Sequence, residues 1–238
     1  MGDTPLDGED LTGDLALSIE TVAGRERPDG ALDMLINTSR GEISGVLHPC
    51  EGQPAAVVFV GGALGGLDGP ANGIYPRLAE SLRAGRTPDE PGGLSGFRLH
   101  YRQPGEFQEC VLDVLAGTSF LKGIGARRVA LVGHSFGAAV VIKAGELSDL
   151  VVGVAALSPQ LYGTRSVERL APRSLLLVHG TADSVLDCAA SRDIHKRALE
   201  PKRLVLYDGA GHGLGACADE LFELLAGWLV EVVDGEES

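Results

Sequence analysis

The stretch VALVGHSFGAAV, residues 129–140, decides the fold. An apolar run typical of a buried strand ends at Gly133, and small apolar residues resume after Ser135 and Gly137. The chain holds 34 glycines, so a G-x-S-x-G pattern is weak evidence until its surroundings are considered. Here a strand-like run leads in and a helix-like run leads out, which is the context that gives the pattern meaning.

A serine in that position is expected to lie on a sharp bend at positive φ, a strained backbone conformation. Glycines two residues before and after it let the strand and the helix pass closely. The bend exposes the Ser135 hydroxyl above the sheet and directs the backbone N–H of Phe136 toward the same place. The alternative is an ordinary strand-to-helix turn with an idle serine.

Apolar runs alternate with helix-like segments on both sides of this stretch. This alternation predicts an α/β fold with a mostly parallel central sheet and helices on both faces. Two earlier β-rich runs, 15–22 and 31–48, predict antiparallel strands at one sheet edge. The other predicted strands are 55–60, 97–101, 127–133, 150–157, 174–180 and 202–207, and the predicted helices are 71–84, 105–125, 136–147, 187–199 and 218–233. A Pro/Gly-rich loop is expected at 86–96.

Length and composition indicate one domain. The 238 residues carry a net charge of −13, which excludes nucleic acid and anionic membrane surfaces as favoured partners. Residues 1–14 predict a disordered acidic tail without a secretory signal, and residues 15–238 predict a single α/β domain. No run approaches the roughly 20 apolar residues that span a bilayer. We therefore expect a soluble, cytoplasmic protein.

The cysteines do not predict a metal site. Cys50, Cys110, Cys188 and Cys217 lack the short paired spacing of zinc ligands and are expected to be free, buried thiols.

A serine nucleophile needs a histidine base and a carboxylate that orients the base. His212, in DGAGHGLG after the last strand, lies in a glycine-rich loop that can bring its ring over the sheet edge. Asp183 follows the strand 174–180, and carboxyl ends of parallel strands meet at one side of the sheet. Asp187 is interpreted as a helix cap, and Asp208 is a weaker candidate for the carboxylate that orients the histidine. Among the remaining histidines, His195 is expected to face solvent, His134 to point elsewhere, His48 to lie near the early strands, and His100 and His179 to lie in or at the ends of buried strands, where either would line the pocket.

The order Ser135, Asp183, His212 is that of the α/β-hydrolase arrangement. With the segments GHSFG, HGTAD and GAGHG, the chain resembles the α/β-hydrolase superfamily from about residue 31 to its end, in particular small serine hydrolases of the dienelactone-hydrolase-like and esterase kind. The resemblance implies an oxyanion hole formed by the backbone N–H groups of Phe136 and Ala63, with Leu64 next in the loop. The His-Gly pair common there in the superfamily is replaced by Gly61-Gly62.

Many relatives carry a helical cap before the strand 174–180. Here residues 158–173 leave room for one short helix, so no large cap domain and an open, shallow site are expected. Residues that follow strand ends on this side are candidate substrate contacts, with a plain surface loop as the alternative: Leu64, Tyr101, Arg102, Gln160, Leu161 and Tyr162. Arg102 would be able to hold a substrate carboxylate.

These patterns together predict a serine hydrolase of small to medium acyl esters that needs no metal or organic cofactor. Its partner is a small-molecule acyl substrate, and the chain is expected to be a monomer or a homodimer paired through its N-terminal edge strand. A thioester, lactone or peptide substrate remains open, as does a non-catalytic binding module on the same fold. A phosphate-binding role for GGALGGLDG is disfavoured because no P-loop lysine follows.

Overall fold

Residues 129–140 form the middle of the molecule in the computed structural model, which describes residues 16–85 and 93–235. Strand β6 (Arg128–His134) runs into Ser135, and helix α3 (Phe136–Leu147) starts at the next residue. The predicted tail 1–14 and residues 86–92 of the predicted loop lie outside the described residues.

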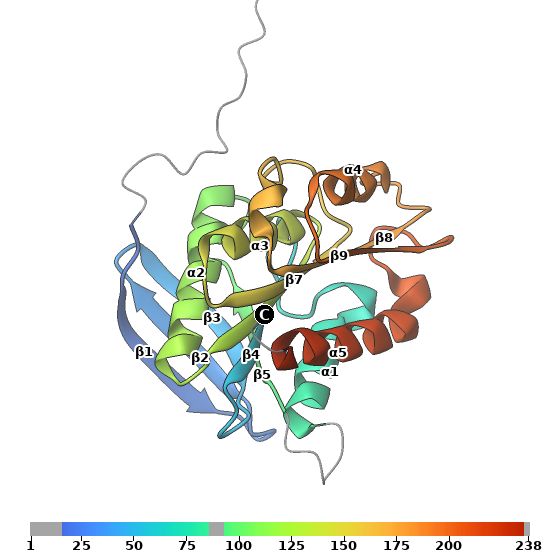
Figure 1. Ribbon diagram of the computed structural model, residues 1–238. Coiled ribbons are helices and arrows are strands. Elements are labelled where there is room, and N and C mark those ends of the chain that lie inside the picture. Colours follow the sequence, from blue (N-terminus) through green and yellow to red (C-terminus); the bar gives the residue numbers. More distant parts are fainter. Residues whose placement is uncertain (1–15, 86–92, 236–238) are drawn as a thin grey trace, which may run out of the picture.

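The described residues form one nine-stranded sheet in the order β1-β2-β3-β5-β4-β6-β7-β8-β9 (Figure 1). Strands β1, β2 and β3 are antiparallel, β3 is antiparallel to β5, and all later neighbours are parallel. The other strands are β1 (Ile19–Glu26), β2 (Leu32–Thr38), β3 (Gly41–His48), β4 (Ala55–Val60), β5 (Ser95–His100), β7 (Val151–Leu157), β8 (Ser174–Gly180) and β9 (Lys202–Tyr207). The mostly parallel sheet with antiparallel N-terminal strands is therefore confirmed.

Helices cover both faces of this sheet. The α-helices α2, α3 and α4 lie against one face, and α1 and α5 lie against the other (Figure 1). Besides α3, the helical elements are α1 (Pro70–Ala84), α2 (Phe107–Gly123), η1 (Val167–Leu170), α4 (Ala189–Arg197), η2 (Gly215–Cys217) and α5 (Ala218–Asp234). None of the helices in the described part of the chain combines the length and the apolar character that crossing a bilayer requires.

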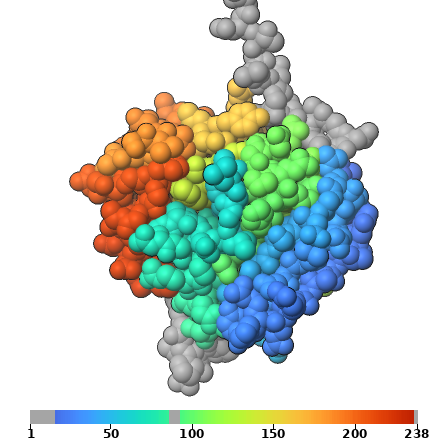
Figure 2. Space-filling model, turned by 180° about the vertical axis from the view of Figure 1, so that it is seen from behind, coloured from blue at the N-terminus to red at the C-terminus, as the bar shows by residue number. Residues whose placement is uncertain are grey.

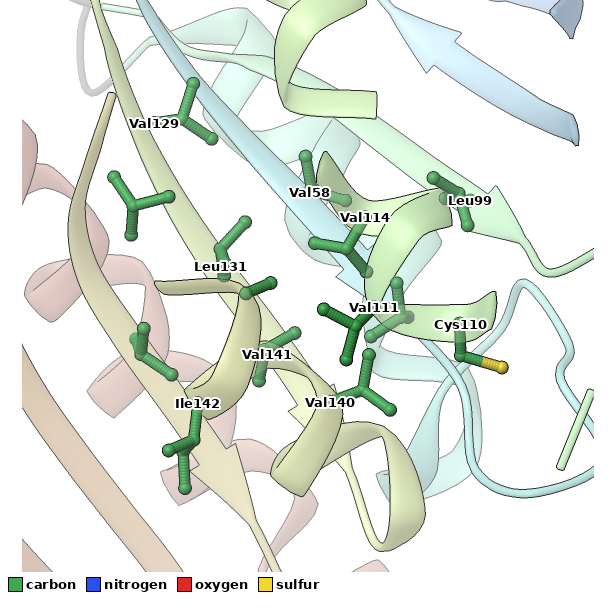
Figure 3. Packing of buried hydrophobic residues seen from close by; sticks show 14 of the residues in the cluster. Val58, Leu99, Cys110, Val111, Val114, Val129, Leu131, Val140, Val141 and Ile142 are labelled. Atoms are coloured by element: carbon green, nitrogen blue, oxygen red, sulfur yellow. The ribbon is translucent and has the colours of Figure 1, made fainter. Parts of the chain in front are cut away.

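Alternating side chains of the central strands fill the two cores. In β4, Val58 packs toward α2 and α3, whereas Phe59 packs toward α1 and α5. Figure 3 shows Leu131 of β6 in the first core, beside Val114 of α2 and Val141 of α3. A strand buried on both faces needs an unbroken apolar run, which is why these strands were recognisable in the sequence.

Two strands, β1 and β5, differ from their predicted bounds by more than one residue. β1 begins four residues after the predicted start at 15 and extends to Glu26, because its register is set by antiparallel pairing with β2, with Glu26 opposite Leu32. β5 begins at Ser95 rather than 97, because Ser95 pairs with Ala56 of β4. Neither boundary is visible in local apolar patterning, since pairing with a neighbouring strand decides it.

The two ends of the sheet come from the two ends of the chain. Figure 2 shows the N-terminal strands in blue on one side and the C-terminal segments in orange and red on the other. β1 is the edge strand at the N-terminal side, as expected, and most of its residues are exposed. The carboxyl ends of β4, β6, β7, β8 and β9 meet at one rim of the sheet, and the candidate site lies there.

The four cysteines are free thiols, as expected. Cys110 and Cys217 are buried, but Cys50 and Cys188 are only half-buried.

Candidate active site

Ser135 occupies a strained bend between β6 and α3, with φ 58° and ψ −117°. The bend is possible because of the glycines around it. A Cβ added at Gly133 would lie 2.2 Å from the Gly137 carbonyl oxygen, and one added at Gly137 would lie 2.1 Å from the Gly61 carbonyl oxygen. Any side chain at these two positions would clash with backbone, so the close approach of strand, helix and loop requires glycine.

The structure brings Ser135, His212 and Asp183 together. The Ser135 Oγ lies 3.0 Å from the His212 Nε2, and the His212 Nδ1 lies 2.7 Å from the Asp183 Oδ2. With Nδ1 protonated, the ring donates to the carboxylate and leaves Nε2 able to accept the serine hydroxyl. The three residues follow β6, β8 and β9, so the sheet topology positions them at one rim.

Both carboxylate oxygens of Asp183 accept hydrogen bonds. Its Oδ1 accepts the backbone N–H groups of Val185 and Leu186 at 2.8 and 2.9 Å, and its side chain has no exposed area. Burial raises the pKa of this carboxyl, but the Leu186 N–H, the His212 ring and the Val185 N–H outweigh burial and hold its pKa below the ordinary value. The carboxylate is therefore ionised beside His212 at neutral pH.

The sequence suggested that the His134 side chain points elsewhere, but it lies against His212. Its ring centroid lies 4.8 Å from that of His212, and its Nε2 donates to the His212 carbonyl oxygen at 2.9 Å. The Ser158 hydroxyl donates to the same carbonyl at 3.2 Å. The expectation failed because the bend at Ser135 directs the preceding side chain over the loop that carries His212. Two donors from β6 and the end of β7 thus fix the backbone of that loop.

Burial lowers the pKa of His134 to about 4, although its bond to the His212 carbonyl acts in the opposite direction. This ring is therefore neutral at pH 7 and adds no positive charge beside His212.

The loop after β4 lies beside the serine. The N–H of Gly65 donates to the Gly62 carbonyl and closes a tight turn with Ala63 and Leu64 at its tip. A Cβ added at Gly62 would lie 3.8 Å from the Ser135 Cβ. The loop backbone therefore approaches the serine at Gly62.

Three candidate substrate contacts are exposed to solvent at this rim. Leu64 is 93% exposed, and Leu161 and Tyr162 are about half exposed; Gln160 beside them is half-buried. Tyr162 packs edge-on against Phe107, which packs edge-on against Phe136. Apolar side chains thus extend from the residue after the serine to the rim. Phe107 lies in the predicted helix 105–125, and nothing in its spacing indicated this contact with the candidate site.

Tyr101 and Arg102 do not lie where the sequence placed them. Tyr101 is buried beneath the loop after β4, with its hydroxyl directed at the Gly61 carbonyl oxygen at 3.5 Å. The Arg102 side chain is 3% exposed and is paired with Asp113 and with Glu109, the latter at 2.8 Å. A buried guanidinium held by two carboxylates is not available to a substrate carboxylate.

No protein-family description matches the sequence, and no curated protein matches it. Solved structures do match the fold. A dienelactone hydrolase from Anabaena variabilis superposes with a TM-score of 0.70 at 16% identity, over 88% of this chain and 99% of that one. The chain has the α/β-hydrolase fold.

Two further structures with the α/β-hydrolase fold are similar to this chain. One, from Xanthomonas campestris, is described as an α/β serine hydrolase without lid; its TM-score is 0.67 at 17% identity, over 90% of this chain and 100% of that one. The other is an esterase domain from Rhodothermus marinus, with a TM-score of 0.61 at 19% identity, over 92% and 100%. In the present α/β-hydrolase fold, residues 158–173 contain only the short helix η1, so the expected lack of a large cap is confirmed.

Proposed function

We propose that the protein is a serine hydrolase that cleaves small to medium acyl esters. One observation carries the proposal: a serine at φ 58° whose Oγ lies 3.0 Å from a histidine that is itself 2.7 Å from a buried carboxylate. A serine hydroxyl becomes a strong nucleophile only beside such a base. The esterase and hydrolase names of the structural neighbours are consistent with this activity.

In the first half of the reaction, the Ser135 oxygen attacks the ester carbonyl carbon while His212 takes the hydroxyl proton at Nε2. Asp183 keeps the ring oriented and stabilises the imidazolium. His212 then gives the proton to the leaving alcohol, and the acyl group remains on Ser135. In the second half, His212 takes a proton from water, the hydroxide attacks the acyl carbon, and the acid leaves as the proton returns to Ser135.

Both halves place negative charge on the carbonyl oxygen. In the proposal, the backbone N–H groups of Phe136 and Ala63 hold this oxyanion, and each donor lowers the barrier by roughly 3 kcal/mol. The close approach of Gly62 to Ser135 supports this role for the loop after β4.

The substrate class follows from the open rim. Residues 158–173 form no cap over Ser135, and Leu64, Leu161 and Tyr162 offer exposed apolar surface beside it. This favours uncharged acyl groups with an apolar part, in a site without lid control. Thioesters, lactones and peptides use the same chemistry, and a panel of these substrates separates them from esters.

The proposal predicts that Ser135→Ala reduces p-nitrophenyl acetate turnover by a factor of about 10⁴ or more, because the acyl acceptor is lost. Turnover is followed by p-nitrophenolate release, and circular dichroism checks that the variant is folded. Ser184→Ala is a matched control, because Ser184 lies in the exposed loop after β8, and it should leave turnover unchanged. Equal turnover by Ser135→Ala and wild type would refute the assignment.

A fluorophosphonate probe separates the hydrolase from a binding module on the same fold. The native protein should be labelled at Ser135, and heat-unfolded protein should not be labelled. Absence of labelling in native protein would favour the binding module.

A further inference from the structure

Two histidines share one oxygen of Asp183. The Oδ2 lies 2.7 Å from the His212 Nδ1 and also 3.1 Å from the Nε2 of His179. His179 is the next-to-last residue of β8, and its side chain has no exposed area. The reaction outlined above uses only His212, so His179 is a buried titratable group that lacks a role there.

The surroundings of His179 define which ring nitrogen carries the proton. The Nε2 lies within hydrogen-bond distance of two acceptors, the Asp183 Oδ2 and the Leu186 carbonyl oxygen, the latter at 3.0 Å. Because neither group can donate, Nε2 must carry hydrogen. The Nδ1 lies 2.7 Å from the Ser191 Oγ of α4, whose hydroxyl is able to donate to it. A neutral ring protonated at Nε2 satisfies all of these contacts.

Asp183 does not depend on His179 for its position. Its Oδ1 is held by the backbone N–H groups of Val185 and Leu186. The bond from His179 instead acts on Oδ2, the oxygen that faces His212. A donor to a carboxylate oxygen disperses its negative charge and weakens its attraction for a neighbouring imidazolium.

We propose that His179 acts on His212 through Asp183: by donating to the shared Oδ2, it sets the basicity of His212. The inference rests on the proposed function, in which His212 is the base. His179 would keep His212 easily deprotonated, so that a larger fraction of the ring is in the neutral, base-competent form at mildly acidic pH.

The other titratable groups around the two rings do not duplicate this effect. Asp183 lies between them, and His134 lies against His212 with a pKa of about 4, so its ring is neutral at pH 7. From α4, the contact with His179 is the uncharged Ser191.

The first test is made on the wild-type protein, without substrate. Long-range ¹H–¹⁵N spectra report which nitrogen of each histidine ring is protonated. We expect His179 to be neutral and protonated at Nε2 at pH 7. A ring protonated only at Nδ1 would overturn the proposal, because its Nε2 would have no hydrogen to donate to Asp183.

The second test measures the His212 pKa by the same spectra in three variants. His179→Leu removes the donor and should raise the His212 pKa by about half a pH unit or more. His179→Gln keeps an N–H donor and should restore the wild-type value. Ser191→Ala is the matched control: it alters the same buried contact but leaves Nε2 between its two acceptors, so it should leave the His212 pKa unchanged.

An unchanged or lower His212 pKa in His179→Leu would overturn the proposal, as would an equal rise in Ser191→Ala, which would indicate a packing effect. If His179→Leu does not fold, the tautomer of the His179 ring in the wild-type protein still tests the proposal. In ester hydrolysis, the acid limb of kcat/KM should move to higher pH by the same amount as the His212 pKa in His179→Leu. Because the spectra need no turnover, failure of the proposed function and failure of this inference give different results.

Discussion

Ser135 adopts a backbone conformation that costs an ordinary residue about 1–3 kcal/mol. The conformation persists because the surrounding packing leaves the chain no alternative. The Gly133, Gly137 and Gly61 backbones meet at distances that exclude any Cβ. The strain therefore belongs to a bend that three chain segments hold together, and it exposes one hydroxyl to His212.

Gly137→Ala tests this bend. The new methyl group would lie 2.1 Å from the Gly61 carbonyl oxygen, so we expect a loss of about 2–4 kcal/mol in the free energy of unfolding and a large loss of the proposed esterase turnover. Gly123→Ala is the matched control, because a Cβ there meets nothing within 4 Å at the end of α2. It should leave the stability within about 1 kcal/mol of wild type. Urea unfolding measures the stability of both variants. Equal stabilities of Gly137→Ala and Gly123→Ala would contradict the packing argument.

Among single residues, Ser135, Asp183 and His212 could be chosen from the sequence because each follows a recognisable strand. The direction of His134 could not be chosen, since it depends on the strained bend beside it. The bond between His179 and Asp183 was equally hidden, because a buried strand residue shows no local sign of its partner.

At the scale of elements, Arg102 joins the end of β5 to α2. Its side chain is buried against Asp113 and Glu109 of α2, and its backbone N–H also donates to Asp113 at 2.8 Å. Burial raises the pKa of Asp113, and Arg102 opposes that rise. Sequence position alone suggested a substrate contact, but a residue after a strand end can turn inward when the next helix offers it a carboxylate.

Arg102→Ala should therefore lower stability rather than alter substrate choice. We expect a loss of about 3 kcal/mol, because Asp113 would be left buried without its partner. Arg25→Ala, which breaks an exposed pair with Asp33 on the edge strands, should leave the stability close to that of wild type. Thermal and urea unfolding measure the stability of both variants. The KM for carboxylate-bearing esters should be unchanged in folded Arg102→Ala. A selective rise in that KM would restore the substrate-binding role.

At the scale of the whole molecule, the two cores hold the sheet from both faces, and the rim carries the titratable groups that respond to acid. His134 has an ordinary pKa of 6.5 when unfolded and a pKa of about 4 when folded. Between these values the unfolded chain binds a proton that the folded chain does not, so stability is complete above pH 6.5 and is lost as the pH falls toward 4. The lowered pKa of Asp183 adds a further loss below about pH 3.8.

This linkage predicts a loss of about 2 kcal/mol from His134 between pH 7 and pH 4.5. His134→Gln keeps an N–H donor for the His212 carbonyl but removes the titration, so its stability should fall less over that interval. Urea unfolding at the two pH values compares the variants. An identical acid loss in both proteins would show that His134 does not contribute.

The sequence by itself determined the α/β architecture, the order of the candidate nucleophile, acid and base, and the absence of a large cap. Apolar periods and glycine-bounded loops are local signals, and each can be recognised without knowing what packs against it. Only the tertiary structure decided that Tyr101 and Arg102 are buried, that His134 lies against His212, and that His179 shares an oxygen of Asp183. Each of these contacts joins segments from different elements, so its direction is set by the packing of the sheet and its helices, which local spacing does not encode.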